Sequence, residues 1–170
     1  AVECLGLCDH APAALVGDVP VRQVSADNIP AWIENPLPAP VGMVGGEDRW
    51  LSGRIAVNDP TDIYAYQSSD GFAAIKKALK EMQPDEVIQE ITDAGLSGRG
   101  GAAFPTGLKW KYTAGAAGAA HYVVCNADES EPGTFKDRVL MEGDPFFVLE
   151  GMVIAGYAIG SHKGYIYIRG

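Results

Sequence analysis

Helix-type and strand-type patterns alternate between residues 72 and 168 of the chain. The apolar residues of the first expected helix recur at helical spacing and are Phe72, Ile75, Leu79 and Met82. Ser69 and Asp70 precede this helix as capping candidates. A second helix is expected from Pro84, where Val87, Ile88 and Ile91 face inward, to Gly95, a natural position for a left-handed C-terminal cap.

Two strands and a third helix are expected next. Residues 121–125 form a short apolar run that suits a buried parallel sheet, and His121 is expected within this strand. Asp144 and Pro145 begin a helix that ends at Gly160, and residues 165–168 form the last strand. The order of helix, strand, helix and strand favours an α/β sheet.

The segment GLSGRGGAAFPTGLKW, residues 95–110, contains five glycines, one arginine and one lysine in sixteen positions. Such a segment exposes backbone N–H groups and adds positive charge, which is how a loop holds phosphate. Gly98, Gly100 and Ala103 match G-x-G-x-x-A formally, but that fingerprint should follow a strand, and here a helix precedes it. A P-loop is also excluded because no G-K-[ST] follows. A flexible surface turn is the alternative interpretation.

The segment NADESEP, residues 126–132, follows the first expected strand directly. Ligands of open α/β sheets usually bind at this end of a strand. Its carboxylates and amide are suited to accept hydrogen bonds from ribose hydroxyls or a carboxamide, and they belong to Asn126, Asp128, Glu129 and Glu131. A solvated acidic turn is the alternative, and a metal site is disfavoured because no histidine or further acid is close in sequence.

The first 60 residues have a different character. Cys4 and Cys8 supply two thiolates, half of what an iron–sulfur cluster or a structural zinc requires, and two free thiols are the alternative. Two short strands around a Gly17-Asp18 turn are expected to form a hairpin. Residues 28–60 are rich in proline and glycine without a sustained period, which predicts an extended linker.

The composition excludes two classes of protein. A net charge of −9 and a pI near 4.7 argue against a nucleic-acid ligand. The longest apolar stretch, residues 146–159, is shorter than the roughly 20 residues of a membrane span. A cytoplasmic protein is therefore expected. The β-rich run at the end, GYIYIRG, needs neighbouring strands, so a piece of a longer polypeptide is also expected.

GLSGRGGAAFPTGLKW followed by YVVCNADESEPGTFKDR closely resembles the flavin-bearing subunit of NADH-quinone oxidoreductase, respiratory complex I, and its soluble relatives. These relatives include the diaphorase subunits of NAD-reducing hydrogenases and the β subunits of NAD-dependent formate dehydrogenases. VECLGLCDHAPAALVGD resembles the end of a thioredoxin-like two-iron two-sulfur ferredoxin module. The resemblance implies a fused α/β protein: the tail of that module in residues 1–27, a linker in 28–60, and the N-terminal part of a Rossmann-like FMN/NADH-binding domain in 61–170.

The resemblance also implies roles for individual residues. The FMN phosphate and isoalloxazine edge would be held by Gly98, Arg99, Gly100, Gly101 and Lys109. The ribityl chain and ring would be bonded by Asn126, Asp128 and Glu129. NADH would be received by Phe104 and Glu131, and Cys4 and Cys8 would be the third and fourth cluster ligands. The implied reaction is hydride transfer from NADH to FMN and single-electron transfer to iron–sulfur clusters, with no general acid or base.

The sequence departs from the family at one position of the glycine-rich segment. The family generally reads GAGFPTG, whereas this chain has Ala103 before Phe104, and the added methyl crowds a loop suited to close backbone approach. The rest of the flavin site and a four-iron cluster are expected beyond Gly170. The implied partners are iron–sulfur subunits of a multisubunit oxidoreductase, which would hold the chain peripherally at the inner membrane. A non-catalytic docking subunit with an empty loop is the alternative, and an unrelated nucleotide-binding module is a third hypothesis.

Overall fold

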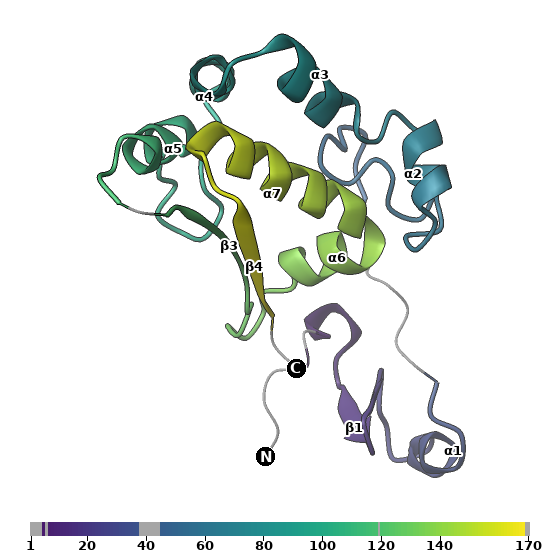
Figure 1. Cartoon of the computed structure of the whole chain (residues 1–170). Helices are drawn as coiled ribbons and strands as arrows, with labels where there is room; N and C mark the ends of the chain where they lie inside the picture. Colours follow the sequence, from purple (N-terminus) through teal and green to yellow (C-terminus); the bar gives the residue numbers. More distant parts are fainter. Residues whose placement is uncertain (1–4, 6, 38–44, 119, 169–170) are drawn as a thin grey trace. The chain divides into compact units, whose positions relative to one another are not determined.

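The computed structural model describes residues 5, 7–37, 45–118 and 120–168 (Figure 1). The chain divides into two compact units. The first contains residues 1–57, 127–144 and 168–170, and the second contains residues 58–126 and 145–167. None of the helices in the described part is both long enough and apolar enough to cross a membrane.

The first unit contains short elements. They are η1 (Cys8–His10), β1 (Ala14–Val16), β2 (Val19–Val21), α1 (Ile29–Glu34) and α6 (Lys136–Gly143). The strands β1 and β2 pair antiparallel with Val16 opposite Val19. Gly17 has a φ of +62° between them, so the hairpin expected at Gly17-Asp18 is confirmed.

The stretch expected to be a linker contains ordered structure of its own. It includes α1 and a buried side chain, Ile55, which is 2 % exposed. Arg54 lies beside Ile55, and its Nε donates to the carboxylate of Asp144 over 2.8 Å. The Asp144 residue is 4 % exposed, so this ion pair fixes the end of α6 within the first unit. The module boundaries expected at residues 27 and 60 stay a prediction.

The second unit is built around a long helix. Its elements are α2 (Ile63–Ser68), α3 (Ala73–Glu81), α4 (Pro84–Asp93), α5 (Thr106–Ala114), β3 (Tyr122–Ala127), α7 (Pro145–Ile159) and β4 (Lys163–Ile168), with the last residue of each strand counted in the first unit. The strands β3 and β4 are neighbours and run in the same direction on one side of α7, with α3 and α4 on its other side (Figure 1). The buried core cluster consists of Ala78, Val87, Ile88 and Ala158.

The two helices and two strands predicted from residue 84 onward are present as α4, β3, α7 and β4, whereas α5 and α6 were not predicted. In α4, Val87 and Ile88 are buried, and Gly95 has a φ of +64° just after the helix. The strand β3 begins one residue later than expected, so placing His121 within it was wrong. The Nδ1 atom of His121 lies 2.7 Å from the carbonyl oxygen of Ile159, and Ser161 Oγ donates to the carbonyl of His121 over 2.8 Å. His121 therefore ties the start of β3 to the end of α7.

The expected capping of α3 was wrong. Ser69 is the C-cap of α2, and its hydroxyl donates to the carbonyl of Ala65 over 2.9 Å. Asp70 has a φ of +61°, and the N-cap of α3 is Phe72, which makes no side-chain cap. The chain thus turns through left-handed residues before α3, and a local side chain does not reach the first turn of the helix.

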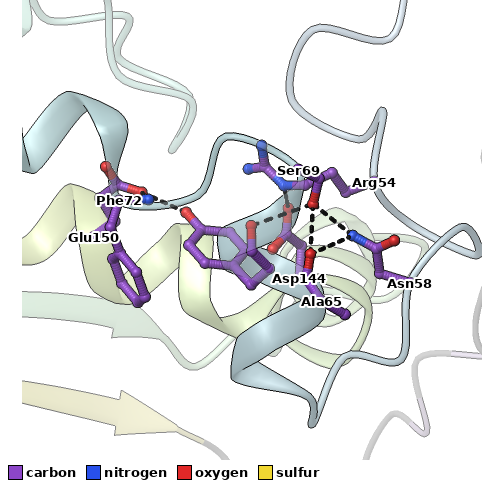
Figure 2. A network of polar contacts seen from close by, with 8 residues as sticks. Arg54, Asn58, Ala65, Ser69, Phe72, Asp144 and Glu150 are labelled. Carbon is purple, nitrogen blue, oxygen red and sulfur yellow. Dashed lines mark hydrogen bonds and ion pairs between the residues drawn. The ribbon is translucent and has the colours of Figure 1, made fainter.

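The first turn of α3 is capped instead by Glu150 of α7 (Figure 2). Its carboxylate accepts from the backbone N–H groups of Phe72 over 2.9 Å and Ile75 over 3.0 Å, and from the hydroxyl of Tyr66 over 2.5 Å. Glu150 is 5 % exposed. A buried carboxylate with three donors is satisfied, and these N-terminal N–H groups of the helix are paired.

The inward face of α3 matches the one expected except at Leu79. Leu79 is 53 % exposed, whereas Ala78 is 4 % exposed and belongs to the core cluster with Ala158 of α7. Two small side chains allow helices to approach closely, and the larger leucine is left outside. Tyr157 of α7 adds a polar link because its hydroxyl donates to the carbonyl of Met82 over 2.7 Å.

Candidate functional site

The glycine-rich segment forms a loop between α4 and α5 that is closed at its base. Ser97 and Pro105 form an isolated antiparallel bridge. The N–H of Gly98 donates to the carbonyl of Phe104 over 2.9 Å, and the N–H of Thr106 donates to the carbonyl of Leu96 over 2.8 Å. Residues 99–103 are therefore a short excursion between fixed ends.

The excursion presents unused hydrogen-bond donors. Within the described part of the chain, the backbone N–H groups of residues 99–103 have no hydrogen-bond partner. A Cβ atom placed on Gly100 or Gly101 would meet nothing within 4 Å, so space is open beside this backbone. Gly101 has a φ of +102°, which L side chains rarely adopt. Unused N–H groups beside open space are suited to an anion.

Positive charge and an aromatic side chain lie at the same loop. Arg99 is exposed in the excursion, and Lys109 is exposed in the first turn of α5. The N-terminus of α5 follows the loop directly and carries the positive end of the helix dipole. Phe104 is 43 % exposed, so its ring is accessible to a planar ligand. The six candidates of this segment lie in the loop, at its base or in the first turn of α5, and they are Gly98, Arg99, Gly100, Gly101, Phe104 and Lys109.

Two of the five glycines have structural roles, one in ending a helix and one in helix packing. Gly95 ends α4, as described above. Gly107 is buried, and a Cβ atom there would lie 2.1 Å from Oγ1 and 2.9 Å from Cα of Thr92. Gly107 therefore allows α5 to pass close to α4 at the base of the loop. Counting glycines in the sequence does not separate this packing role from a ligand-binding one.

Ala103, which stands where the resemblance implies glycine, adopts a φ of +49°. This left-handed conformation costs an L residue about 1–2 kcal/mol relative to glycine. The side chain is exposed, so the departure from the family is tolerated at the cost of local backbone strain.

Ala103→Gly is expected to stabilise the chain by about 0.5–1 kcal/mol, since relief of the strain exceeds the added entropy of the unfolded chain. Urea denaturation followed by circular dichroism measures this difference. Ala102→Gly is the matched control, because Ala102 has no positive φ and should lose stability on the same change. Equal losses for both variants would contradict the assignment of strain to Ala103.

The acidic loop between β3 and α6 holds the second group of candidates. Asp128, Glu129 and Glu131 belong to the first unit, whereas Asn126 lies in β3 in the second unit. The hydroxyl of Ser130 donates to the carboxylate of Asp128. Glu131 is exposed, and its carbonyl accepts from the N–H of Thr134 over 3.0 Å.

The turn that ends the acidic loop is specified by its sequence. Pro132 and Gly133 are the central residues between Glu131 and Thr134, and Gly133 has a φ of +86°. This order of proline and left-handed glycine fits a type II turn. The Pro-Gly pair is a local signal from which the turn could have been predicted.

Glu129 makes contacts that its place in an acidic run does not predict. Its two carboxylate oxygens accept from the backbone N–H groups of Asp137 and Arg138, each over 2.7 Å. Its own φ is +46°. The carboxylate of Glu129 therefore caps the N-terminus of α6.

The cysteines are only partly covered by the structure. Cys8 is exposed in η1, whereas Cys4 lies outside the described residues, so their joint role as metal ligands stays a prediction. Cys125 is half-buried in β3. Across residues 5, 7–37, 45–118 and 120–168, no three or more His, Cys, Asp or Glu side chains come together in a way that could hold a metal ion.

Comparison with known proteins finds related sequences. Residues 91–170 match the family model of the Nuo51 FMN-binding domain. The chain is 48% identical to an NADH-quinone oxidoreductase subunit of Rhizobium meliloti over 71% of its own length and 28% of that protein. It is 39% identical to the alpha subunit of the NAD-reducing hydrogenase HoxS of Cupriavidus necator over 98% of its own length and 29% of that protein.

A solved structure extends the match to the fold. The NAD+-reducing [NiFe]-hydrogenase in the air-oxidized state contains a chain that is 38% identical and superimposes with a TM-score of 0.70. The match covers 98% of this chain and 29% of the hydrogenase chain. The chain therefore spans less than a third of the length of these relatives. The resemblance of the glycine-rich and acidic segments is thus confirmed: residues 91–170 match the Nuo51 FMN-binding domain, and the chain is similar to part of the NADH-quinone oxidoreductase and NAD-reducing hydrogenase subunits.

Proposed function

We propose that the chain is part of a flavoprotein that oxidises NADH by hydride transfer to FMN within a multisubunit oxidoreductase. The observation that carries this proposal is the loop of residues 99–103, whose five unpaired N–H groups lie beside open space at Gly100 and Gly101 within the described part of the chain. The match of residues 91–170 to an FMN-binding domain covers this loop and supports the same function.

The donors of the glycine-rich loop fit the phosphate of FMN. Backbone N–H groups and a helix N-terminus bind phosphate without a dedicated side chain. Arg99 and Lys109 add positive charge that offsets the charge of the phosphate. The glycine backbone at Gly100 and Gly101 lets the ligand approach closely. These groups bind and orient the cofactor, whereas hydride acceptance and single-electron release are the chemistry that FMN itself supplies.

The acidic loop contains the remaining residues that are proposed to contact FMN or NADH. Asn126 and Asp128 provide acceptors for the ribityl hydroxyls and the flavin ring. Glu131 and Phe104 are proposed to receive NADH, Glu131 through ribose hydroxyls and Phe104 through stacking. None of these residues needs to act as a general acid or base, because hydride transfer moves no proton through the protein.

The finer organisation is also a proposal. Residues 61–170 would be the N-terminal part of a Rossmann-like FMN/NADH-binding domain, and residues 1–27 the tail of a thioredoxin-like two-iron two-sulfur module. The hydrogenase subunit aligns with 98% of the chain, including this N-terminal part, which supports the fused arrangement. Cys4 and Cys8 would be two of the four cluster ligands. Partner iron–sulfur subunits, a four-iron cluster beyond residue 170 and a cytoplasmic location belong to the same proposal.

The test is an anaerobic titration of the chain with FMN, followed by NADH, with the flavin absorbance as the readout. FMN binding and bleaching by NADH are expected. If a folded chain binds no FMN, the titration is repeated with the chain extended beyond Gly170. Failure of both proteins to bind would overturn the proposed function and would favour a docking subunit with an empty loop.

Arg99→Gln is expected to weaken FMN binding about 10-fold or more, since it removes a charge-assisted hydrogen bond to phosphate. Gly100→Ala should also weaken binding, because its methyl occupies the open space beside the loop. Lys77→Gln is the control. Lys77 is exposed in α3 and pairs with Glu90, so this substitution removes one positive charge away from the loop. A dissociation constant unchanged by Arg99→Gln would contradict the assignment of the phosphate to this loop.

A further inference from the structure

The helix α6 lacks a cap of its own. Its N-cap residue is Phe135, which has no side chain able to accept a hydrogen bond. The N–H groups that an N-cap side chain normally binds are those of the second and third helical residues, here Asp137 and Arg138. Both donate over 2.7 Å to the carboxylate of Glu129, six residues before the N-cap. One acid in the loop thus replaces the missing local cap.

The backbone at Glu129 is held in an unusual conformation. Its φ of +46° is uncommon for a residue with a Cβ and is rarest outside Asn, Asp and His. Such a conformation persists where the surrounding structure fixes it. The two hydrogen bonds to α6 fix Glu129 from one side, and the turn from Glu131 to Thr134 fixes the following residues. The path of the acidic loop is therefore set by the side chain of Glu129.

We propose that Glu129 is a positioning residue, which acts on the ligand by tying the acidic loop to α6. Both of its oxygens are engaged with backbone donors, so its effect passes through the loop and through neighbours such as Asp128. This inference rests on the proposed FMN-binding function. Its structural part, the tie between Glu129 and α6, is independent of any ligand.

Three variants separate the possible roles of this side chain. Glu129→Gln keeps the length but opposes one N–H of α6 with an amide NH₂. Glu129→Asp keeps the charge but is one methylene shorter, so it cannot reach both N–H groups from the same backbone. Glu142→Gln is the control. Glu142 is exposed and pairs with Arg138, so the substitution removes one charge from the same helix without touching the loop.

The first readout is hydrogen exchange at the amides of Asp137 and Arg138 without ligand. Exchange is expected to accelerate about 10-fold or more in Glu129→Gln and Glu129→Asp, because both variants weaken the hydrogen bonds that protect these amides, and to stay unchanged in Glu142→Gln. Unchanged exchange in both Glu129 variants would overturn the tie to α6, whether or not the chain binds FMN.

The second readout is the affinity and the visible spectrum of FMN in the protein that binds it, which is the chain or its extended form. Positioning predicts that Glu129→Asp weakens FMN binding and shifts the spectrum as much as Glu129→Gln does, because both break the geometry. Full retention of affinity in Glu129→Asp would show that only the charge matters and would overturn positioning. Faster exchange with unchanged affinity and spectrum in both variants would reduce Glu129 to a structural cap. If the unsubstituted protein binds no FMN in either form, the proposed function and positioning fail together, while the exchange result still decides the tie.

Discussion

Gly107→Ala is expected to destabilise the chain by about 3 kcal/mol, the upper part of the range for overpacked interiors. The added Cβ would lie 2.1 Å from Thr92 Oγ1 and 2.9 Å from the Cα and N atoms of Thr92. The hydroxyl could rotate away, but the two backbone atoms belong to α4 and can move only if the helices separate. The same displacement would disturb the base of the glycine-rich loop, which joins these two helices.

Urea denaturation followed by circular dichroism at about 222 nm, the usual wavelength for helices, measures this loss as a shift of the midpoint. Gly151→Ala is the matched control, since a Cβ atom on Gly151 within α7 would meet nothing within 4 Å. It should gain about 0.5–1 kcal/mol from the better helix propensity of alanine. The close contact of α4 and α5 would be contradicted by a Gly107→Ala chain as stable as the unsubstituted one.

Glu150→Ala is expected to cost about 4 kcal/mol, because hydrogen bonds to a charged group each contribute about 1.5–3 kcal/mol and are not additive. The substitution removes the acceptor that Glu150 provides for the buried hydroxyl of Tyr66 and for the N–H groups of Phe72 and Ile75 in the first turn of α3. Glu150→Gln should lose about half as much, since its amide oxygen replaces one of the two carboxylate oxygens.

The control for the Glu150 variants is a substitution of an exposed acid in the same unit. Glu90 pairs with Lys77 over 2.9 Å at the surface, and Glu90→Ala should cost at most about 1 kcal/mol. Hydrogen exchange resolved by residue shows where the chain is destabilised, because only the Glu150 variants should accelerate exchange at the start of α3. Equal losses for the Glu90 and Glu150 variants would show that the buried carboxylate contributes no more than a surface ion pair.

Local signals in the sequence predicted the parts of the fold that depend on neighbours along the chain. Gly17 and Gly95 adopt the left-handed conformations that their turn and helix end require, with φ of +62° and +64°. The buried pair Val87 and Ile88 follows from helical spacing alone. These features are decided within a few residues, so a single sequence contains them.

Features that depend on distant residues were not predictable in this way. The sequence indicates Ser69 or Asp70 as the cap of α3, whereas the acceptor comes from Glu150, 78 residues after Phe72. The choice of Ala78 over Leu79 for the core depends on the small side chain of Ala158 in the same cluster. Periodicity locates a helix, but the partner helix decides which side of it is buried.

In the candidate site, too, some features follow from neighbouring residues and others depend on residues that are distant in the sequence. Residue types and spacing were sufficient to identify both loops, and the comparisons agree with the family that these loops indicate. They did not reveal that Gly107 is needed for packing or that Glu129 caps α6, since both depend on side chains and backbone brought together by folding. A glycine or an acid in a motif can therefore have one of several physical roles, and its residue type does not show which.

The closed base of the glycine-rich loop has a consequence for the entropy of ligand binding. Ordering a flexible residue costs about 1–2 kcal/mol, and a longer loop adds a closure term. Here the bonds from Gly98 to Phe104 and from Thr106 to Leu96 already hold both ends before any ligand arrives. An anion that binds residues 99–103 therefore restrains only a short, preorganised segment, so more of its interaction energy appears as affinity.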